Sequence, residues 1–401
     1  MKINTTHINK LTKTMERINS PLYFYDLDYL VKHLTYLDKN KDPNIKLWYA
    51  CKANPMSAIL KVFRNLNFGI DIASKGELDQ ALRSGIEPEN LIATGPAKSF
   101  EYFKELLRNE VNTIVLESVN QAYWLNEAAK LLNKTPKVLL RVQLSWEKGS
   151  SVLGGNDITP FGIGPEEWKK LDRSRCTNLD FLGFHVFQWG NILSLKDLKE
   201  IWTTIIKEIS ALSNDIKIPI KVLDLGGGIG IPYEPGQNDL DFKDINDILV
   251  DLKTKYKLET IWLELGRYAV GSSGHYLAKV IDRKHVRGRE LLILEGGINH
   301  ICRPALTNQS FPCQLYRSSN ATNITFHIHG PLCTALDYLG EFELPADSNI
   351  GDWICFNQAG AYGFTEAMPF FLCHNLPAEV IMYNQAIMTP RTGKTSADWM
   401  I

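Results

Sequence analysis

The stretch Leu47-Trp48-Tyr49-Ala50-Cys51-Lys52-Ala53-Asn54 decides how the rest of this sequence is interpreted. Five apolar or aromatic residues lead directly to Lys52, and Asn54-Pro55 ends the run, so the pattern predicts a short buried strand with an amine at its exit. Such a lysine often reaches solvent past its own aliphatic stem. The alternative is an amine in a partly dry pocket, where a lowered pKa makes it a nucleophile that forms Schiff bases.

Short apolar strands alternate with amphipathic helical segments on both sides of this stretch. The eight predicted strands are Lys46–Ala53, Phe68–Ala73, Leu91–Thr94, Thr113–Glu117, Lys137–Val142, Phe181–Phe187, Val222–Leu225 and Thr260–Leu265. The predicted helices include Gly76–Ser84, Phe100–Arg108, Asn120–Leu132 and Lys196–Leu212. Eight strands with intervening helices over about 220 residues are typical of a (β/α)8 TIM-like barrel in an α/β protein.

The pattern changes after Tyr268, where strand-like segments follow one another with few helical patterns between them. These segments are Leu277–Ile281, Leu291–Leu294, Ile324–His329, Trp353–Asn357 and Glu379–Tyr383. We therefore expect a barrel over residues 31–270 and a mostly antiparallel β domain over residues 271–401. The segment Trp146–Thr159 contains five glycine or serine residues and is predicted to be a mobile loop over one end of the barrel.

Composition excludes several classes of protein. The chain has 401 residues, 44% of them hydrophobic, which is ample for a core, and its net charge of −1 gives no electrostatic case for binding nucleic acid or an anionic membrane. The polar N-terminus lacks the apolar region of a secretory signal, and no apolar run approaches the ~18 residues of a membrane span. Seven cysteines without a Cys-x-x-Cys pair are typical of free thiols in the cytoplasm.

Polar residues follow every predicted barrel strand, at the end where such barrels carry their chemistry. In chain order they are Lys52; Asp71, Ser74 and Glu77; Lys98; Glu117; Arg141; His185; Gly226-Gly227-Gly228; and Glu264 with Gly266-Arg267. Any one of them could cap a helix or lie in solvent. Their occurrence at all eight exits favours an active site.

The glycine run Asp224–Gly230 has neither the Gly-x-Gly-x-x-Gly nor the Gly-Lys-Ser/Thr spacing of nucleotide-binding loops. Its backbone amides could converge on a phosphate after the seventh strand, with a bidentate contact from Arg267; a tight turn without a ligand is the alternative. A lysine across a barrel from a phosphate site suggests pyridoxal 5′-phosphate.

Two further residues fit that cofactor. Glu264 could keep the pyridine nitrogen protonated, which makes the ring an electron sink and favours loss of CO2; an ion pair with Arg267 or another base is the alternative. His185 is placed to stack on the ring, although a lone histidine in an apolar strand is more often a buried structural residue.

The chain resembles the fold-type III pyridoxal-phosphate-dependent decarboxylases, which include the diaminopimelate, ornithine and arginine decarboxylases and share the alanine-racemase-like fold. The resemblance extends from about Pro21 to Val380. It rests on seven motifs in one order: Tyr49–Asn54, Asp71–Glu77, His185, Gly226–Gly228, Glu264–Arg267, Gly330–Cys333 and Gly360–Gly363.

By this resemblance Lys52 forms the Schiff base, His185 stacks on the ring and Glu264 pairs with its nitrogen. The full implied cofactor-binding set is Lys52, Asp71, His185, Gly226, Gly227, Gly228, Glu264, Gly266, Arg267 and Tyr362. Cys333 would return a proton to Cα after CO2 leaves, and in this family that cysteine comes from the other subunit of a homodimer. The N-terminal segment, residues 1–30, is expected to join the β domain.

Departures from the family pattern concern the substrate, for which the implied binding residues are Arg267, Arg303, Thr334 and Asp337. Thr334 replaces the acidic residue that binds a distal amine, and breaking such a buried pair costs roughly 3–5 kcal/mol. Asp337 could still supply one charge. Arg303 matches an arginine that takes a distal carboxylate in diaminopimelate decarboxylases, but Thr307 replaces the usual tyrosine.

A Phe187–Gly190 segment also stands where the family has Gly-Ser, which puts one phosphate contact in doubt. The resulting pattern is similar to a divergent branch that acts on carrier-protein-bound glutamyl groups or on citrate–diaminopropionate conjugates in siderophore assembly. A free diamino-acid decarboxylase, a racemase and a non-catalytic regulatory homologue remain as alternatives.

A metal site at His327, His329 and Cys333 lacks a fourth ligand, so no metal is expected.

Overall fold

A computed structural model describes residues 11, 15–18, 21–146, 150–151, 154–155 and 158–400. The chain forms two compact units. We call the first the β unit; it contains Met1–Lys32, Pro232–Gln237 and Val270–Ile401. The second, the barrel unit, contains His33–Ile231 and Asn238–Ala269. Half of the predicted mobile loop at Trp146–Thr159 lies outside the described residues, and the described half includes the short paired strands β7 (Ser150–Ser151) and β8 (Gly154–Gly155).

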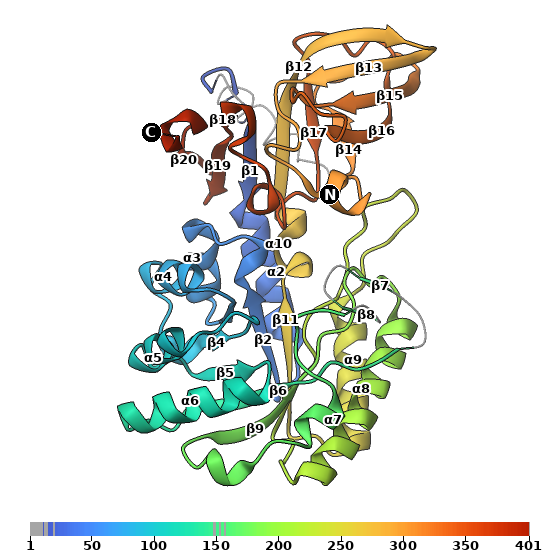
Figure 1. Cartoon of the computed structure of the whole chain (residues 1–401). Coiled ribbons are helices and arrows are strands. Elements are labelled where there is room, and N and C mark those ends of the chain that lie inside the picture. The colour runs from blue at the N-terminus through green and yellow to red at the C-terminus, as the bar shows by residue number, and fades with distance from the viewer. Residues whose placement is uncertain are drawn as a thin grey trace. The chain divides into compact units, whose positions relative to one another are not determined.

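Eight parallel strands close the barrel (Figure 1). They are β2 (Ile45–Ala50), β3 (Gly69–Ile72), β4 (Leu91–Ala93), β5 (Thr113–Leu116), β6 (Lys137–Arg141), β9 (Asp180–His185), β10 (Val222–Asp224) and β11 (Thr260–Leu265). Each predicted strand is present, and pairing of β11 with β2 completes the circle. The predicted (β/α)8 barrel is therefore confirmed.

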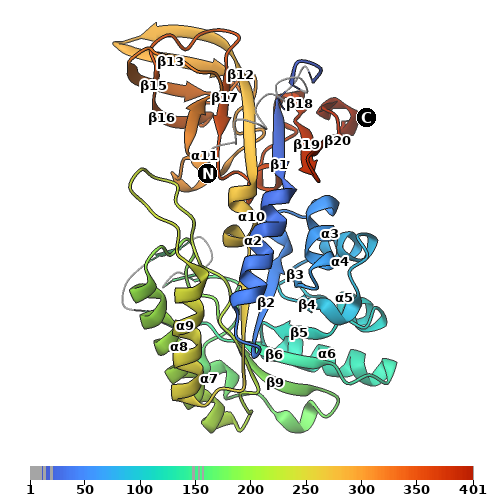
Figure 2. The same cartoon turned by 180° about the vertical axis from the view of Figure 1, so that it is seen from behind.

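Helices alternate with these strands along the chain and lie outside them (Figures 1 and 2). They are α2 (Leu27–Asn40), α3 (Ser57–Asn65), α4 (Lys75–Arg83), α5 (Phe100–Arg108), α6 (Val119–Leu132), α7 (Pro165–Trp168), α8 (Leu195–Ile216), α9 (Phe242–Tyr256) and α10 (Arg267–Val270). Serine caps fix the start of several: Ser74, Ser99, Ser118 and Ser194 each accept a hydrogen bond from a backbone amide three residues on.

Large apolar side chains fill the barrel interior. This core contains Trp48, Ile92, Val115, Leu139, Val222 and Trp262, with Leu182 packed against it. The ring centroids of Trp48 and Trp262 lie 4.9 Å apart, and Gly69 on the strand next to β2 makes room for the Trp48 ring. A Cβ atom on Gly69 would lie 2.2 Å from Cε3 of Trp48, so this glycine is required by close packing and not by its backbone angles.

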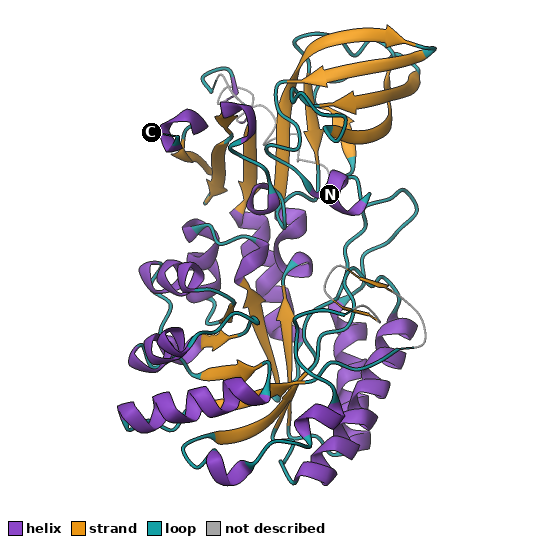
Figure 3. Cartoon of the chain, viewed as in Figure 1, coloured by secondary structure: helices purple, strands orange, loops and turns teal. Residues whose placement is uncertain are grey.

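The β unit is built on a nine-stranded sheet, and strands dominate it in Figure 3. Its strands are β1 (Leu22–Asp26), β12 (Gly274–Val286), β13 (Arg289–Leu294), β14 (Cys313–Leu315), β15 (Asn323–His329), β16 (Tyr338–Pro345), β17 (Trp353–Phe356), β19 (Ala378–Tyr383) and β20 (Ala386–Arg391). The short helix α11 (Arg303–Thr307) and the two-stranded pair β18 (Asn375–Leu376) and β21 (Lys394–Thr395) complete the unit. Pairings β1–β19 and β13–β15 are parallel, and the others are antiparallel.

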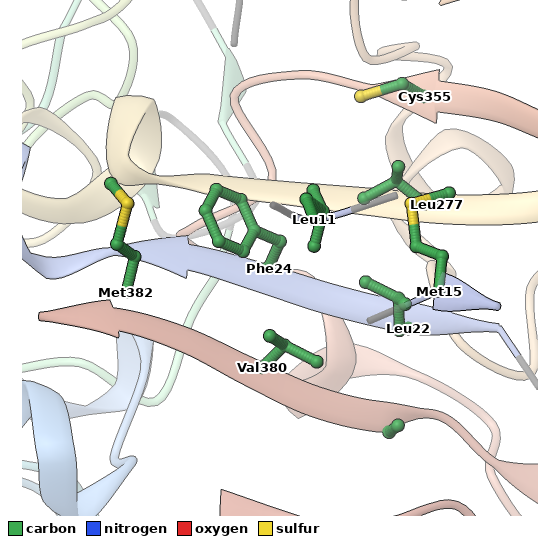
Figure 4. Close-up of a cluster of buried hydrophobic side chains, with 9 residues drawn as sticks. Leu11, Met15, Leu22, Phe24, Leu277, Cys355, Val380 and Met382 are labelled. Atoms are coloured by element: carbon green, nitrogen blue, oxygen red, sulfur yellow. The ribbon is translucent and has the colours of Figure 1, made fainter. Parts of the chain in front are cut away.

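The N-terminal strand β1 lies inside this sheet, between β12 and β19. Leu22 pairs with Leu277 on one side and with Ala378 on the other. Figure 4 shows Leu22 and Phe24 packed with Val380 and Met382 in an apolar cluster that also includes Leu11 and Met15. Burial of these side chains on both neighbouring strands fixes the register of β1.

None of the described helices combines the length and the apolar character that crossing a membrane requires.

Substitution Gly69→Ala should destabilise the barrel by about 1–3 kcal/mol, because the added methyl group collides with the Trp48 ring. Urea denaturation measures the loss. Gly76→Ala is the matched control: Gly76 lies in α4, and the atom nearest to an added Cβ would be 3.8 Å away, so alanine should stabilise by up to about 1 kcal/mol. Equal unfolding free energies for Gly69→Ala and wild type would show that the ring can move aside.

Candidate active site

Lys52 lies just beyond the barrel strand that the sequence predicted for it. Strand β2 ends at Ala50, and Cys51–Ala53 form a single 3-10 turn instead of three more strand residues. The turn is held by the Asn54 amide, which donates to the Cys51 carbonyl, and by the Tyr49 hydroxyl, which donates to the Asn54 carbonyl at 2.8 Å. The Lys52 side chain is 39% exposed, so the amine is accessible to a ligand.

Asp71 orients this amine. Nζ of Lys52 lies 3.2 Å from Oδ2 of Asp71, and the hydroxyl of Thr94 donates to Oδ1 at 2.6 Å. Burial and the nearby charge of Glu264 raise the pKa of Asp71, against the attraction of Lys52. Ser74 and Glu77, from the same strand exit, instead fix the start of α4: the Ser74 hydroxyl accepts from the Glu77 amide, and the Glu77 carboxylate accepts from the Ala73 amide.

His185, Asp224 and Glu264 form a buried polar cluster at the ends of β9, β10 and β11. One ligand atom from each lies within 4.8 Å of the others, and Nε2 of His185 lies 3.1 Å from Oε1 of Glu264. Burial would raise the pKa of Glu264, but the attraction of His185, Lys52 and Arg141 outweighs it and lowers that pKa to about 2. Glu264 is therefore ionised throughout the physiological range.

Asp224 has the opposite character, because burial and the charge of Glu264 raise its pKa well above the usual value. Its Oδ1 accepts from the Gly226 amide at 2.8 Å. Within the described residues, Oδ2 of Asp224 and Nδ1 of His185 are buried without a hydrogen-bond partner. Histidine and two carboxylates could ligate a metal ion, and a bound organic group with polar atoms would equally satisfy these two atoms.

The glycine run lies beside this cluster and is packed tightly on both sides. Cβ atoms at Gly227 and Gly228 would lie 2.4 and 2.3 Å from the carbonyl oxygens of Glu264 and Trp189. Gly226 and Gly228 also have positive φ angles of 65° and 106°. Of the described groups, none accepts a hydrogen bond from the amides of Gly227 or Gly228, so both donors remain available to an anion.

The Phe187–Gly190 segment that departs from the family pattern lies against the same glycines. A Cβ at Gly226 would lie 2.9 Å from the Phe187 ring, and the Ile192 amide donates to the Gly228 carbonyl at 2.8 Å. Trp189 packs edge-on against Trp146 with ring centroids 4.7 Å apart. An aromatic wall thus stands where a small hydroxyl residue was expected.

A second buried charged network joins the ends of β4, β5 and β6. Oε1 of Glu117 accepts from Nη1 of Arg141 at 3.0 Å, its Oε2 accepts from the Gly162 amide at 2.7 Å, and Nζ of Lys98 lies 4.0 Å from the same carboxylate. The sequence places these three residues at strand exits but does not indicate a role for them. The sequence pattern that could have indicated this network is the alternation of basic and acidic residues after three successive strands.

In the β unit, Arg303 begins α11 and Tyr362 lies close to it. The Arg303 guanidinium lies 4.9 Å from the Tyr362 ring centroid, and its Nη1 donates to Oε2 of Glu366 at 2.5 Å. Glu366 was not singled out from the sequence. It is 63 residues from Arg303, and no local pattern indicates the pairing.

Cys333 and Thr334 are in a turn of the β unit, and Cys333 is exposed. The Thr334 hydroxyl accepts from the Leu336 amide at 3.2 Å. Asp337 is 1% exposed, and its carboxylate accepts from the amides of Ile298 and Leu332 at 2.8 and 2.7 Å. These two hydrogen bonds fix the turn that carries Cys333. A contact between Asp337 and the substrate stays a prediction.

The barrel unit thus gathers Lys52, Asp71, His185, the glycine run and Glu264 at its strand ends, together with Gly266 and the 8% exposed Arg267 at the start of α10. An amine beside a carboxylate, an ionised buried carboxylate and two free backbone amides are suited to a phosphorylated aldehyde. A sequence model of the pyridoxal-dependent decarboxylases, describing their pyridoxal-binding domain, matches residues 27–271. The chain belongs to this family.

Three relatives show the range of activities within the decarboxylase family. The L-glutamyl-(BtrI acyl-carrier protein) decarboxylase of Niallia circulans is 28% identical over 99% of this chain and 96% of its own length. The diaminopimelate decarboxylase of Aquifex aeolicus is 27% identical, with coverages of 94% and 90%. The 2-((L-alanin-3-ylcarbamoyl)methyl)-2-hydroxybutanedioate decarboxylase of Staphylococcus aureus is 30% identical, with coverages of 88% and 92%.

A solved structure confirms the fold. The diaminopimelate decarboxylase of Helicobacter pylori, complexed with L-lysine, superimposes with a TM-score of 0.87 over 97% of this chain and 98% of that one, at 23% identity. The decarboxylase described here is therefore a fold-type III enzyme, as the resemblance implied, and its cofactor is pyridoxal 5′-phosphate. The orphaned atoms of His185 and Asp224 and the free glycine amides fit that cofactor.

The pH dependence of stability should reveal the buried network. Burial lowers the pKa of Lys98 to about 8, although Glu117 opposes the shift. Between pH 8 and about 10.4, the unfolded-state value, the unfolded chain holds a proton that the folded chain has released, so this residue's contribution to stability rises with pH. Relative to Lys98→Met, the wild-type unfolding free energy should therefore rise by up to about 1.4 kcal/mol per pH unit above pH 8.

Denaturant unfolding at several pH values between 7 and 9.5 measures this difference. Lys61→Met, at an exposed position, is the control and should give a constant difference. A constant difference for Lys98→Met as well would contradict the lowered pKa.

Proposed function

We propose that this enzyme decarboxylates an amino acid whose side chain is conjugated to a larger group, in preference to a free diamino acid. The observation that carries the proposal is Thr334, a neutral residue with its hydroxyl engaged by the Leu336 amide, directly after Cys333. A free diamino acid needs a carboxylate for its distal ammonium group, because a buried unpaired charge costs several kcal/mol. Two of the three relatives above act, by name, on conjugates.

Residues of the barrel unit would hold the cofactor. The amides of Gly227 and Gly228, with Arg267 and Gly266, would bind its phosphate; in the β unit Tyr362 would do the same, as in the family. Lys52 would carry it covalently, and Asp71, whose Oδ2 lies 3.2 Å from Nζ of Lys52, orients that amine. When bound, pyridoxal phosphate withdraws electrons from the substrate Cα so that CO2 can leave.

Glu264 and His185 would set the electronic character of the site. With a pKa of about 2, Glu264 supplies a fixed negative charge beside His185, and this charge favours a protonated pyridine nitrogen. This favours decarboxylation over racemisation, which uses a less electron-withdrawing ring. His185 would cover one face of the ring.

Cys333 would return the proton to Cα, with the second copy of the chain supplying it in a homodimer. Cys333 is exposed, and the hydrogen bond from the Leu332 amide to Asp337 holds its turn at the surface of the β unit, as this role requires. Both Lys52 and Cys333 are present, which favours an enzyme over a non-catalytic homologue.

Diaminopimelate decarboxylation is the second candidate. The retention of Arg303 favours it, together with the relative from Aquifex aeolicus.

Lys52→Ala should abolish the visible absorbance band of the bound cofactor, which in the wild-type enzyme should disappear on borohydride treatment. Lys75→Ala, at an exposed lysine paired with Glu105, should retain the band. Spectra of the two variants and of the wild type provide the measurement. A visible band in Lys52→Ala that borohydride abolishes would assign the covalent role to another lysine.

The substrate class is tested by CO2 release from two sets of compounds. We expect turnover of γ-L-glutamyl ethylamide and of an L-glutamyl-loaded acyl-carrier protein. With meso-diaminopimelate, L-ornithine, L-lysine and L-arginine, activity should be at least about 100-fold lower. This factor corresponds to the loss of a charge partner that contributes about 3 kcal/mol to binding. Rapid turnover of any one free diamino acid would reject the proposal.

A further inference from the structure

We infer that Glu366 determines substrate specificity by occupying Arg303, so that the site takes an acyl tail whose distal carboxyl group is masked as a neutral thioester or amide. This inference rests on the proposed function and narrows it to one kind of conjugate.

The ion pair between Arg303 and Glu366 is well formed. The Nη1–Oε2 distance is 2.5 Å, and the two side chains are only 13% and 32% exposed, so solvent screens the pair incompletely. The guanidinium also stacks on the Tyr362 ring at 4.9 Å. Both contacts hold the arginine in one orientation before any substrate arrives.

The segment that carries Glu366 is itself fixed to the segment that carries Arg303. The Glu366 amide donates to the Gly363 carbonyl at 3.3 Å, within the turn Phe364–Glu366. The Met368 amide donates to the Ile298 carbonyl at 3.2 Å, and the Ile298 amide donates to Asp337. Backbone hydrogen bonds therefore fix the segments that carry Arg303 and Glu366, so their pairing is not a chance contact of two surface side chains.

The second arginine close to this segment is also neutralised. Arg391 stacks on Phe364 at 4.8 Å and pairs with Glu379 at 3.2 Å. A substrate carboxylate at Arg303 would have to displace Glu366 or lie beside it, where like charges repel. A neutral carbonyl oxygen faces no such repulsion. Arg303 can also donate a hydrogen bond to this carbonyl oxygen, because Nε of Arg303 has no acceptor among the described residues.

The chemistry of decarboxylation decides which conjugate has such a neutral tail. The reaction needs a free α-amine and a free α-carboxylate, so an L-glutamyl group must be attached to its carrier through the side-chain carboxyl. Attachment converts that distal carboxylate into an uncharged carbonyl. Diaminopimelate keeps its distal carboxylate, and the butanedioate conjugate named for the Staphylococcus aureus relative keeps two. The acyl-carrier type therefore fits the Arg303–Glu366 pair best.

Glu366→Gln tests this assignment, because it frees the guanidinium at nearly constant shape. For wild type we expect turnover of γ-L-glutamyl ethylamide and poor use of L-glutamate. In Glu366→Gln the KM for L-glutamate should fall by about tenfold or more, the change expected from removing one like-charge contact. The KM for the ethylamide should change less than about threefold, since its carbonyl is neutral.

Calorimetric titration with glutarate adds a readout that does not depend on turnover. Glutarate should bind Glu366→Gln and not wild type, and the double variant Glu366→Gln/Arg303→Met should lose that binding. Glu366→Asp should keep the wild-type discrimination. Glu343→Gln is the matched control, because Glu343 accepts from the Thr325 hydroxyl on another part of the β unit and should change neither KM nor binding.

Different outcomes would contradict the role of Glu366 and the preference for a conjugated substrate. If folded Glu366→Gln shows wild-type KM values and no glutarate binding, the role of Glu366 is overturned, and turnover of the ethylamide by wild type still supports the proposed function. If wild type prefers a free diamino acid, the proposed function is overturned, and with it the neutral-tail assignment, whatever Glu366→Gln binds.

Discussion

Closure of the barrel brings eight strand ends into one ring, and the buried charges there are tolerable only as pairs. The buried carboxylates of Asp71, Glu117 and Glu264 lie beside Lys52, Arg141 and His185, respectively. An isolated ionised group at such a depth would be neutralised by a shift in its pKa. Pairing therefore keeps the site charged, and a charged site can hold a phosphorylated cofactor in a defined orientation.

The ring is not electrically uniform. Between β9 and β11, Glu264 is strongly ionised while burial and its charge raise the pKa of Asp224. Between β4 and β6, Glu117 is shared by Arg141 and approached by Lys98. Among the residues that the structure describes, the first arc leaves polar atoms of His185 and Asp224 without hydrogen-bond partners, whereas both oxygens of the Glu117 carboxylate in the second arc accept hydrogen bonds. We therefore interpret the first as the ligand-binding arc and the second as its structural support.

Much of this architecture could be predicted from the sequence, because strand ends follow hydrophobic runs. All eight barrel strands are predicted from the sequence, and the polar residues at their exits indicate the candidate site. The β unit was harder. For example, Pro390 in β20 interrupts a run of residues that would otherwise predict a strand. The pairing of Arg303 with Glu366 and the hydrogen bonds of the Ile298 and Leu332 amides to Asp337 join loops that meet only in the folded chain. The spacing of residues in the sequence therefore does not predict them.

The position of β1 has a consequence for synthesis of the chain. Strand β1 is made first, but its neighbours β12 and β19 begin only at Gly274 and Ala378. At about 5–20 residues per second, the ribosome needs roughly 13–50 seconds to bring the first neighbour out. During that interval Leu22 and Phe24 have no sheet to join, while the barrel strands β2 to β11 emerge one after another. The nascent polypeptide thus carries an apolar, unpaired segment ahead of a nearly complete barrel, and this is the stage at which a chaperone would protect it from aggregation.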